Sequence, residues 1–489
     1  MAETVSVGFR SDRGPILIAL MLSTGLIAID ATILATAVPS VVDDLGGFSQ
    51  FPWLFSIYLL AQAVSTPVYA KLADTIGRKP LMLFGVGVFL VGSILCGFAW
   101  DMGSLIVFRA IQGFGAGAVM PISVTIAGDI YTVRERAKAQ GYLASVWAIS
   151  SVVGPTLGGL FSEYLSWRWI FFVNIPLCLI AAWMLLRNYH EQLEPRRHRL
   201  DIAGASTLTV GLTLVILGLL EGGQAWAWLS WQSAVAFGAG GVLLVVFGFI
   251  ERRAAEPVLP LWIFQRRLIL TTSLIGLGVG AALIGLTSYV PTFLETSAGV
   301  TPLVSGLAVA ALTLGWPIAA SQSGRLYLRI GFRPTAFIGL SITVVGTAML
   351  YLFAASPSAV LSAIACFVVG VGMGLVATPT LIAAQSSVPW NERGVVTGTN
   401  MFTRSIGSAV GAAVFGAVAN AIIARSGLGS DSPEAIQQAA SAVFLAVMVA
   451  AVLTLLAAVA MPRARVDDVE LRAPEEAPVS PASPSAPPA

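Results

Sequence analysis

The stretch L-I-V-F-R-A-I-Q-G-F-G-A-G, from Leu105 to Gly117, decides the fold because a very similar stretch returns about half a chain later. The correspondence keeps one shift of 257 positions through the charged turn at Arg134 and the apolar run at Val152. The matched pairs are Gly113 and Gly370, Gly115 and Gly372, Gly117 and Gly374, Glu135 and Glu392, Arg136 and Arg393, Gly141 and Gly398, Gly154 and Gly411, and Gly159 and Gly416. A duplicated membrane unit is the simplest cause of such a repeat.

The composition indicates a membrane protein without catalytic chemistry. Of the 489 residues 56% are apolar and 11% are charged, which is far too apolar for a soluble globular chain. The net charge of +2 comes from short separate basic clusters, so we expect no nucleic-acid partner. Cys96, Cys178 and Cys366 lie in apolar runs, and the only histidines, His190 and His198, share one polar loop. We therefore expect no disulfide, metal, cofactor or enzyme activity.

Fourteen apolar stretches are long enough to cross a hydrocarbon core of about 30 Å, which takes about 20 helical residues. Helix is the expected structure because membrane barrels give shorter segments of alternating polarity. The predicted spans are residues 15–38, 52–72, 81–100, 104–130, 137–162, 168–187, 201–221, 231–250, 268–290, 303–322, 334–354, 358–387, 393–424 and 438–461.

Lysine and arginine favour one side of these spans. With the N-terminus inside, the outer loops keep only Arg168 and Arg425, and the inner segments carry nearly all the other basic residues. Positively charged loops resist translocation, so we expect both termini in the cytoplasm and the chain in the inner or plasma membrane.

The repeat also predicts how the chain is divided. Spans 201–221 and 231–250 have no partner in the repeat, so we expect them to be an insertion that forms a peripheral hairpin. The Pro- and Ser-rich end cannot bury a core and indicates disorder. The predicted parts are a cytoplasmic N-terminus (1–13), a first six-helix bundle (14–190), a linker with two extra helices (191–260), a second six-helix bundle (261–461) and a disordered tail (462–489).

Five motifs follow one another along the chain. Residues 69–80 read Y-A-K-L-A-D-T-I-G-R-K-P, and a degenerate copy begins at Gly324 with Leu328 in place of the acid. The first span contains I-D-A-T-I-L-A-T-A-V-P from Ile29, and the sixth opens with W-R-W-I-F-F-V-N-I-P at Trp167. The other two motifs are Arg109 with Gln112 and Gly113 in the fourth span, and Gly154, Pro155, Gly158 and Gly159 in the fifth.

By these motifs the chain resembles the major facilitator superfamily over nearly its whole length, and within it the fourteen-helix drug:proton antiporters. The loop motif is similar to that of the family at Leu72, Asp74, Gly77, Arg78 and Lys79. It departs at Ala70, where glycine is usual, and the fifth-span motif departs at Ser150. The resemblance implies an all-α fold of two six-helix bundles plus two inserted helices, and exchange against protons by alternating access.

The resemblance also implies roles for the loop and the fifth-span motif. Asp74 would face the N-terminus of a helix in the other half, which begins near Glu392, and would latch the inner gate. Helix N-termini attract carboxylates by about 0.3–1 kcal/mol. The alternative is a tight turn that only keeps its positive charges inside. Gly154 and Pro155 would form the antiporter hinge, and the alternative is an ordinary kink.

Three charged residues lie well inside the spans, where an ionised group is costly unless it faces a cavity or a partner. Asp30 is the deepest acid and is our candidate for the coupling proton, and the alternative is a buried acid bonded to a hydroxyl such as that of Thr32. The resemblance gives Arg109 a role in proton transfer, and the alternative is a snorkelling arginine. Arg404 either lines a cavity or pairs two helices. Asp129 lies near a span end, where solvation favours a structural role.

The predicted function is a proton-coupled antiporter that exports hydrophobic or amphipathic small molecules, often cationic, with proton and substrate competing for Asp30. Export of an endogenous lipid or other hydrophobic metabolite is the alternative. Arg404 and Trp147 are candidates for the cavity wall. The expected partners are the small-molecule substrate, protons and membrane lipids, and the expected state is a monomer. A receptor or scaffold is disfavoured because a repeat with a gating loop serves halves that rock.

Overall fold

The computed structural model describes residues 7–46, 53–191, 201–222, 226–254, 257–260, 262–426 and 432–463. Residues 192–200, which include His198, lie outside the described residues, as do residues 1–6 and nearly all of the tail predicted to be disordered. The helices are α1 (Gly14–Leu45), α2 (Trp53–Ile76), α3 (Arg78–Gly97), α4 (Met102–Ile130), α5 (Val133–Tyr164), α6 (Trp169–Phe172), α7 (Asn174–Asn188), α8 (Ile202–Glu221), α9 (Trp231–Glu251), α10 (Trp262–Gln265), α11 (Arg267–Ser297), α12 (Pro302–Ile330), α13 (Phe332–Phe353), α14 (Ala359–Ser386), the short η2 (Trp390–Glu392), α15 (Arg393–Ser426) and α16 (Pro433–Ala460).

Within the described residues, fourteen helices are long and apolar enough to cross a membrane, which confirms the predicted number of spans. The predicted span 168–187 agrees with the span from Trp169 to Asn188, in which a short break separates α6 from α7 because Pro176 has no N–H to continue the hydrogen-bond ladder. Some predicted ends fall several residues short of the helix end. The span 303–322 continues as α12 to Ile330, because its arginines and leucines are good helix formers that extend the helix past the apolar stretch.

The two halves of the repeat share a glycine turn. Gly77 separates α2 from α3 with φ 102°, and Gly331 separates α12 from α13 with φ 88°. Residues with a side chain rarely adopt such a positive φ, so glycine is required at both turns. The loop motif and its degenerate copy therefore form equivalent turns in the two halves.

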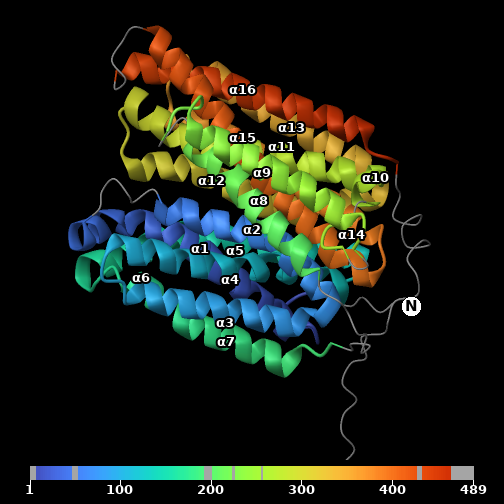
Figure 1. Ribbon diagram of the computed structural model, residues 1–489. Helices are drawn as coiled ribbons and strands as arrows, with labels where there is room; N and C mark the ends of the chain where they lie inside the picture. The colour runs from blue at the N-terminus through green and yellow to red at the C-terminus, as the bar shows by residue number, and fades with distance from the viewer. Residues whose placement is uncertain are drawn as a thin grey trace, which may run out of the picture.

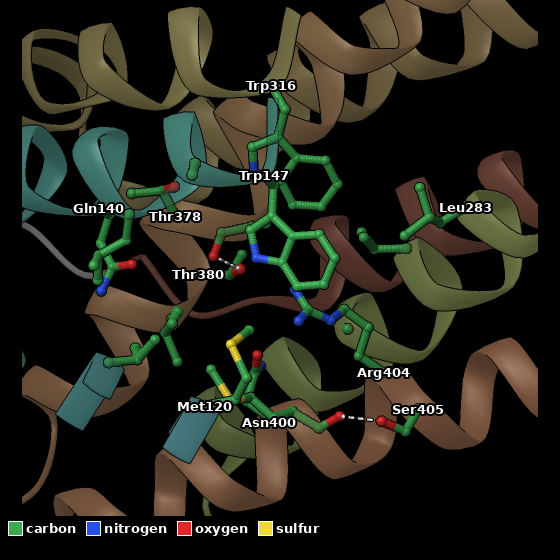
Figure 2. A pocket seen from close by; sticks show the side chains of 18 of the residues that line it. Met120, Gln140, Trp147, Leu283, Trp316, Thr378, Thr380, Asn400, Arg404 and Ser405 are labelled. Atoms are coloured by element: carbon green, nitrogen blue, oxygen red, sulfur yellow. Dashed lines mark hydrogen bonds between the residues drawn. The ribbon is translucent and has the colours of Figure 1, made fainter. Parts of the chain in front are cut away.

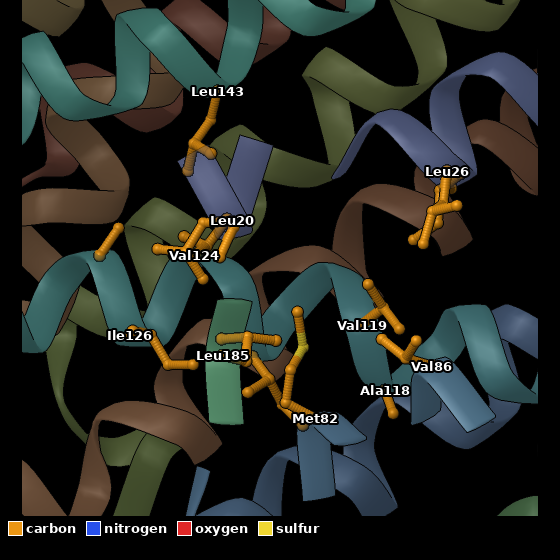
Figure 3. Packing of buried hydrophobic residues seen from close by; sticks show 14 of the residues in the cluster. Leu20, Leu26, Met82, Val86, Ala118, Val119, Val124, Ile126, Leu143 and Leu185 are labelled. Atoms are coloured by element: carbon orange, nitrogen blue, oxygen red, sulfur yellow. The ribbon is translucent and has the colours of Figure 1, made fainter. Parts of the chain in front are cut away.

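Each half has its own apolar core. One cluster joins α1, α3, α4 and α7, and includes Leu20, Met82, Val119 and Leu185 (Figure 3). The corresponding cluster of the second half joins α11, α13, α14 and α16. In Figure 1, α3 and α7 lie at one outer edge of the molecule, and α13 and α16 lie toward the opposite edge. The helices that carry the candidate site lie between these edges.

The inserted helices α8 and α9 pack against each other as a hairpin. This hairpin rests on α2 of the first half and α15 of the second, through apolar residues such as Leu208 and Leu212. No residue of α8 or α9 lines the pocket between the halves. The pair α8 and α9 thus lies outside this pocket, in contact with both halves (Figure 1).

Candidate functional site

A pocket of about 270 Å³ lies between the two halves. Its wall comes from α1, α4 and α5 on one side and from α11, α12, α14 and α15 on the other. Trp147 and Trp316 project into it together with the polar side chains of Gln140 and Asn400 (Figure 2). This volume is just below the range of about 300–1,000 Å³ for small-molecule sites. The pocket thus has the place and the lining of a site for a small amphipathic molecule.

Arg404 lines this pocket, as does Trp147, the other candidate for the cavity wall. Among the described residues that line the wall, Arg404 is the only charged one, and none is a carboxylate. Among the described residues, its guanidinium has no hydrogen-bond or ion-pair partner, so Arg404 does not pair two helices. Of the two alternatives for this residue, the structure supports cavity lining.

Asp30 lies in a buried polar network of the first half. Its carboxylate accepts hydrogen bonds from Arg109 Nη1 at 2.6 Å, Gln112 Nε2 at 2.8 Å and Asn174 Nδ2 at 3.4 Å. Asp30 and Arg109 are each 1% exposed. Ser93 accepts from both Gln112 and Asn174, so the network joins α1, α3, α4 and α7. Because it is buried and charged, this network is sensitive to any change of protonation.

This geometry excludes the alternatives of a hydrogen bond from Thr32 to Asp30 and of a snorkelling Arg109. The Thr32 hydroxyl donates to backbone carbonyls of Ala28 and Ser150 and makes no bond to Asp30. Arg109 does not snorkel: its guanidinium also donates to the Leu54 carbonyl at 3.2 Å and lies 4.2 Å from the centre of the Tyr58 ring. The charges of Asp30 and Arg109 are thus both satisfied by contacts inside the bundle.

Asp30 is not part of the pocket wall. The nearest wall residue on the same helix is Thr24, six positions away, or about 9 Å at 1.5 Å per residue. A substrate in this pocket therefore does not touch the carboxylate in the conformation described. The expected direct competition between proton and substrate at Asp30 does not match this arrangement, and any coupling has to pass through the helices.

Gly154 provides such a connection between α1 and α5. A Cβ at this position would collide with the Thr32 side chain and would lie 3.1 Å from Ile33 N, so glycine lets the two helices touch. Gly158 is buried, whereas a Cβ on Gly159 would meet no atom within 4 Å. The side chain of Pro155 lies outside the described part of the structure. Close packing is thus confined to one face of the motif.

The loop motif meets the other half at the side of the molecule where the chain begins. We call this the N-terminal side, because Arg13 pairs there with Glu135 at the start of α5, at 3.0 Å. Asp74 accepts hydrogen bonds from the backbone N–H groups of Gly394 at 3.0 Å and Val395 at 2.8 Å, in the first turn of α15. Its side chain is 3% exposed. Asp74 therefore faces the helix N-terminus that the resemblance implies.

Arg78 extends this contact into an ion-pair network between the halves. It donates to Asp74 at 2.7 Å and to Asp129 at 3.2 Å, and it lies over the Trp390 ring at 3.6 Å. Asp129 also accepts from Arg393 of the second half at 3.3 Å. We call the set Asp74, Arg78, Asp129, Trp390 and Arg393 the gate network. It closes the space between the halves on the N-terminal side.

The other loop-motif residues support the gate network from behind. Glu191 accepts from the backbone N–H groups of Arg78 and Lys79, each at 3.0 Å. The Lys79 ammonium donates to the Leu186 carbonyl, and Leu72 packs on the apolar core of the first half. Together with the Gly77 turn, these contacts fix the orientation of Arg78.

The gate network contains residues that the sequence reading missed. Asp129 was expected to be solvated near a span end, but its side chain is only 2% exposed because Arg78 and Arg393 cover it. Trp390 and Arg393 were not singled out for a role. The signal was present in the repeat, where Glu392 and Arg393 match Glu135 and Arg136.

Small residues let the two halves pack closely on the N-terminal side. Gly394 and Gly398 of α15 give room to Ala70 of α2, and Ala137 of α5 lies against Gly324 of α12. Glycines on α15 therefore provide the space that a glycine at Ala70 would have given. In the degenerate copy of the motif on α12, Leu328 stands at the position of Asp74, so this copy has no equivalent acid. Of these two contacts, the described residues give a carboxylate latch to α2–α15 alone.

Between α5 of the first half and α12 and α14 of the second, different contacts hold the halves together. The Tyr327 hydroxyl of α12 donates to the Val133 carbonyl of α5, and Arg136 donates to Ser386 Oγ of α14 at 2.7 Å. The first turn of α5 is capped within its own half, where Glu135 accepts from Thr132. The two contacts between the halves on the N-terminal side thus resemble each other in packing and differ in charge.

Comparison with known proteins agrees with this geometry. Residues 20–412 match the family model of the Major Facilitator Superfamily. "Multidrug transporter protein MdtP" of Bacillus subtilis (strain 168) is 35% identical over 414 residues, which cover 85% of this chain and 76% of that protein. "Multidrug resistance protein 3" of the same organism is 33% identical over 403 residues, which cover 82% and 79%.

A solved structure has the same fold. The crystal structure of the human organic anion transporter MFSD10 (TETRAN) matches with a TM-score of 0.64 at 15% sequence identity. The match covers 91% of this chain and 99% of that one. At 15% identity this match shows a shared arrangement of the helices and nothing about the substrate.

Proposed function

The chain belongs to the Major Facilitator Superfamily and is a multi-pass membrane transporter, and from this premise we propose that it is a proton-coupled antiporter that exports hydrophobic or amphipathic small molecules. The proposed location is the inner or plasma membrane, with both termini in the cytoplasm. The observation that carries the coupling is the buried Asp30–Arg109 pair at 2.6 Å. This pair joins α1 and α4 within the first half and contains no residue of the gate network.

Alternating access is supported by where the contacts between the halves lie. The pocket lies between the halves, and the gate network closes them on the N-terminal side. In such a state the pocket is shut off from the side that we propose to be cytoplasmic. Breaking the gate network while forming contacts at the other end would expose the pocket to that side.

Proton coupling is supported by the chemistry of the buried pair. Protonation of Asp30 removes the negative charge that holds Arg109, and one carboxyl oxygen becomes a hydrogen-bond donor. The loss of the negative charge leaves the Arg109 guanidinium unbalanced in the network. A buried charge without its partner is strongly unfavourable, so the helices around it have a reason to rearrange.

A mechanical path leads from this pair to the pocket. Asp30 and Thr32 lie on α1, and Thr32 touches Gly154 on α5. Trp147, two turns before Gly154, projects from α5 into the pocket. A shift of α1 that follows protonation therefore reaches the pocket wall through one tight contact. We propose this route in place of direct competition at a shared carboxylate.

The test is proton movement that depends on substrate. Purified protein is reconstituted into vesicles with a pH-sensitive dye inside, and a panel of amphipathic dyes of negative, zero and positive charge is screened for transport, with lipids as a separate arm. The proposal expects an imposed pH gradient to drive at least one small molecule uphill, with matching proton flow that an uncoupler abolishes. Transport that continues unchanged without a gradient would contradict it, and transport of lipids alone would favour the alternative substrate class.

A further inference from the structure

The electrostatics of the pocket lead to an inference about the substrate, which rests on the proposed function. Because Arg404 is the single charged residue among the described residues of the wall, we infer that the pocket selects amphipathic organic anions, such as an aromatic carboxylate or sulfonate. This is a narrower class than the hydrophobic or cationic molecules predicted from the sequence.

The first step concerns the unmet hydrogen bonds of Arg404. A guanidinium has five N–H donors and no acceptor. Among the described residues none of these donors has a protein partner, although Arg404 lies about three turns into α15, in the pocket between the halves. A buried charge is tolerated when it is paired or faces a cavity. An anion in the cavity would supply the missing partner, with two oxygens that match the guanidinium fork.

The second step concerns the other polar groups of the wall. Asn400, Ser405 and Ser408 lie within one turn of Arg404, and each already donates to a backbone carbonyl. The Thr24 hydroxyl, on the α1 side of the pocket, is buried and has no hydrogen-bond partner among the described residues. The Arg404 guanidinium and the Thr24 hydroxyl thus remain as donors without a partner among the described residues, and a negatively charged group would accept from both.

The third step concerns cations. A positively charged substrate would lie in the same small pocket as the guanidinium, with no carboxylate to offset the repulsion. The indole rings of Trp147 and Trp316 attract cations, but their faces also serve as apolar walls for an aromatic ring (Figure 2). An anionic head at Arg404 and an aromatic body against Trp147 and Trp316 therefore fit this wall.

The experiment measures binding to the purified full chain with three probes of one skeleton. The probes are 2-naphthaleneacetate, its neutral amide 2-naphthaleneacetamide, and the cation 2-(2-naphthyl)ethylammonium, titrated by calorimetry in detergent. The inference expects the anion to bind at least about tenfold more tightly than either analogue. This comparison uses the unaltered protein and does not depend on a variant that folds.

Variants then assign the preference to Arg404. Arg404→Gln is expected to weaken the anion at least about tenfold while leaving the neutral amide nearly unchanged, and Arg404→Lys is expected to keep part of the preference. Arg425→Gln, on the exposed end of the same helix, is the matched control and should bind like the unaltered protein.

Three results would overturn the inference: tighter or equal binding of the cation, an anion preference that survives in Arg404→Gln, and no binding of the anion at all. Failure of the proposed function looks different. If the anion binds as expected but a pH gradient does not drive its transport in vesicles, the selectivity stands and the proton coupling fails. If only cations are driven by the gradient, the coupling stands and the selectivity fails.

Discussion

Asp74→Asn tests the latch between the halves. The carboxylate of Asp74 caps the first turn of α15 with two hydrogen bonds, at 3.0 and 2.8 Å, and is 3% exposed. Asparagine has nearly the same shape, so it keeps one acceptor oxygen and removes the charge and the second acceptor. Arg78 keeps its contacts with Asp129 and Trp390, so we expect the protein to remain folded.

The size of the effect follows from these contacts. A hydrogen bond to a charged group contributes about 1.5–3 kcal/mol, and a negative charge at a helix N-terminus adds about 0.3–1 kcal/mol. Burial of the carboxylate opposes both gains, so we take about 2 kcal/mol as the net loss. At 1.4 kcal/mol per factor of ten, the conformer closed on the N-terminal side loses roughly 30-fold in population relative to the open one.

The assay is the distance between the halves on the N-terminal side. Spin labels at Arg187→Cys on α7 and Arg329→Cys on α12 occupy exposed positions, and the three native cysteines are buried. We expect Asp74→Asn to broaden or lengthen the distance distribution and to slow transport. Asp43→Asn, an exposed acid near the other end of α1, is the control. An unchanged distribution together with full transport would refute the latch and leave the motif as a topology signal.

Further changes test other parts of the same account. Gly154→Leu should lower turnover at least about tenfold while substrate still binds, because the new side chain collides with Thr32. Gly159→Ala should leave turnover unchanged, because its Cβ meets no atom within 4 Å. Equal effects of the two variants in transport assays would contradict the role of Gly154 as a hinge. Hydrogen bonds from Arg168 and Trp167 lower the pKa of Asp44, so its ionised form is favoured by folding. Its stabilising effect should be complete near neutral pH and be lost as the pH falls below the usual carboxylate range of about 4. Because the Arg168–Asp44 pair is exposed, Asp44→Asn should lower stability by less than about 1 kcal/mol, less still at high salt, and a thermal-shift difference that grew toward acid pH would contradict this sign.

Much of the fold is predictable because each span carries its own signal. Apolar stretches of about 20 residues specify membrane helices locally, and the repeat relates the two halves without any knowledge of contacts. Asp74 was also within reach, since the loop motif and the turn before Glu392 are both visible in the sequence. The break between α6 and α7 was missed because a short non-helical step does not alter average hydropathy.

The rest depends on contacts between distant residues. Asp129 meets Arg78 from 51 positions away and Arg393 from 264 positions away, so its burial cannot be read from its place near a span end. The separation of Asp30 from the pocket is also a matter of packing, because two residues of one helix can face different surroundings. The sequence identified Asp30 as a candidate and missed Asp129, and it could not show which surfaces either acid faces.

The measurement that tests the central claim most directly is gradient-driven transport by Asp30→Asn. Vesicles containing the variant, the unaltered protein or Asp43→Asn receive the same imposed pH gradient, and both binding and uphill accumulation of a substrate found in the screen are followed from about pH 5.5 to 8.5. The account predicts that Asp30→Asn still binds substrate but no longer concentrates it at any pH, while the control behaves like the unaltered protein. Uphill, pH-dependent accumulation by Asp30→Asn would contradict it and move the proton site away from the Asp30–Arg109 pair.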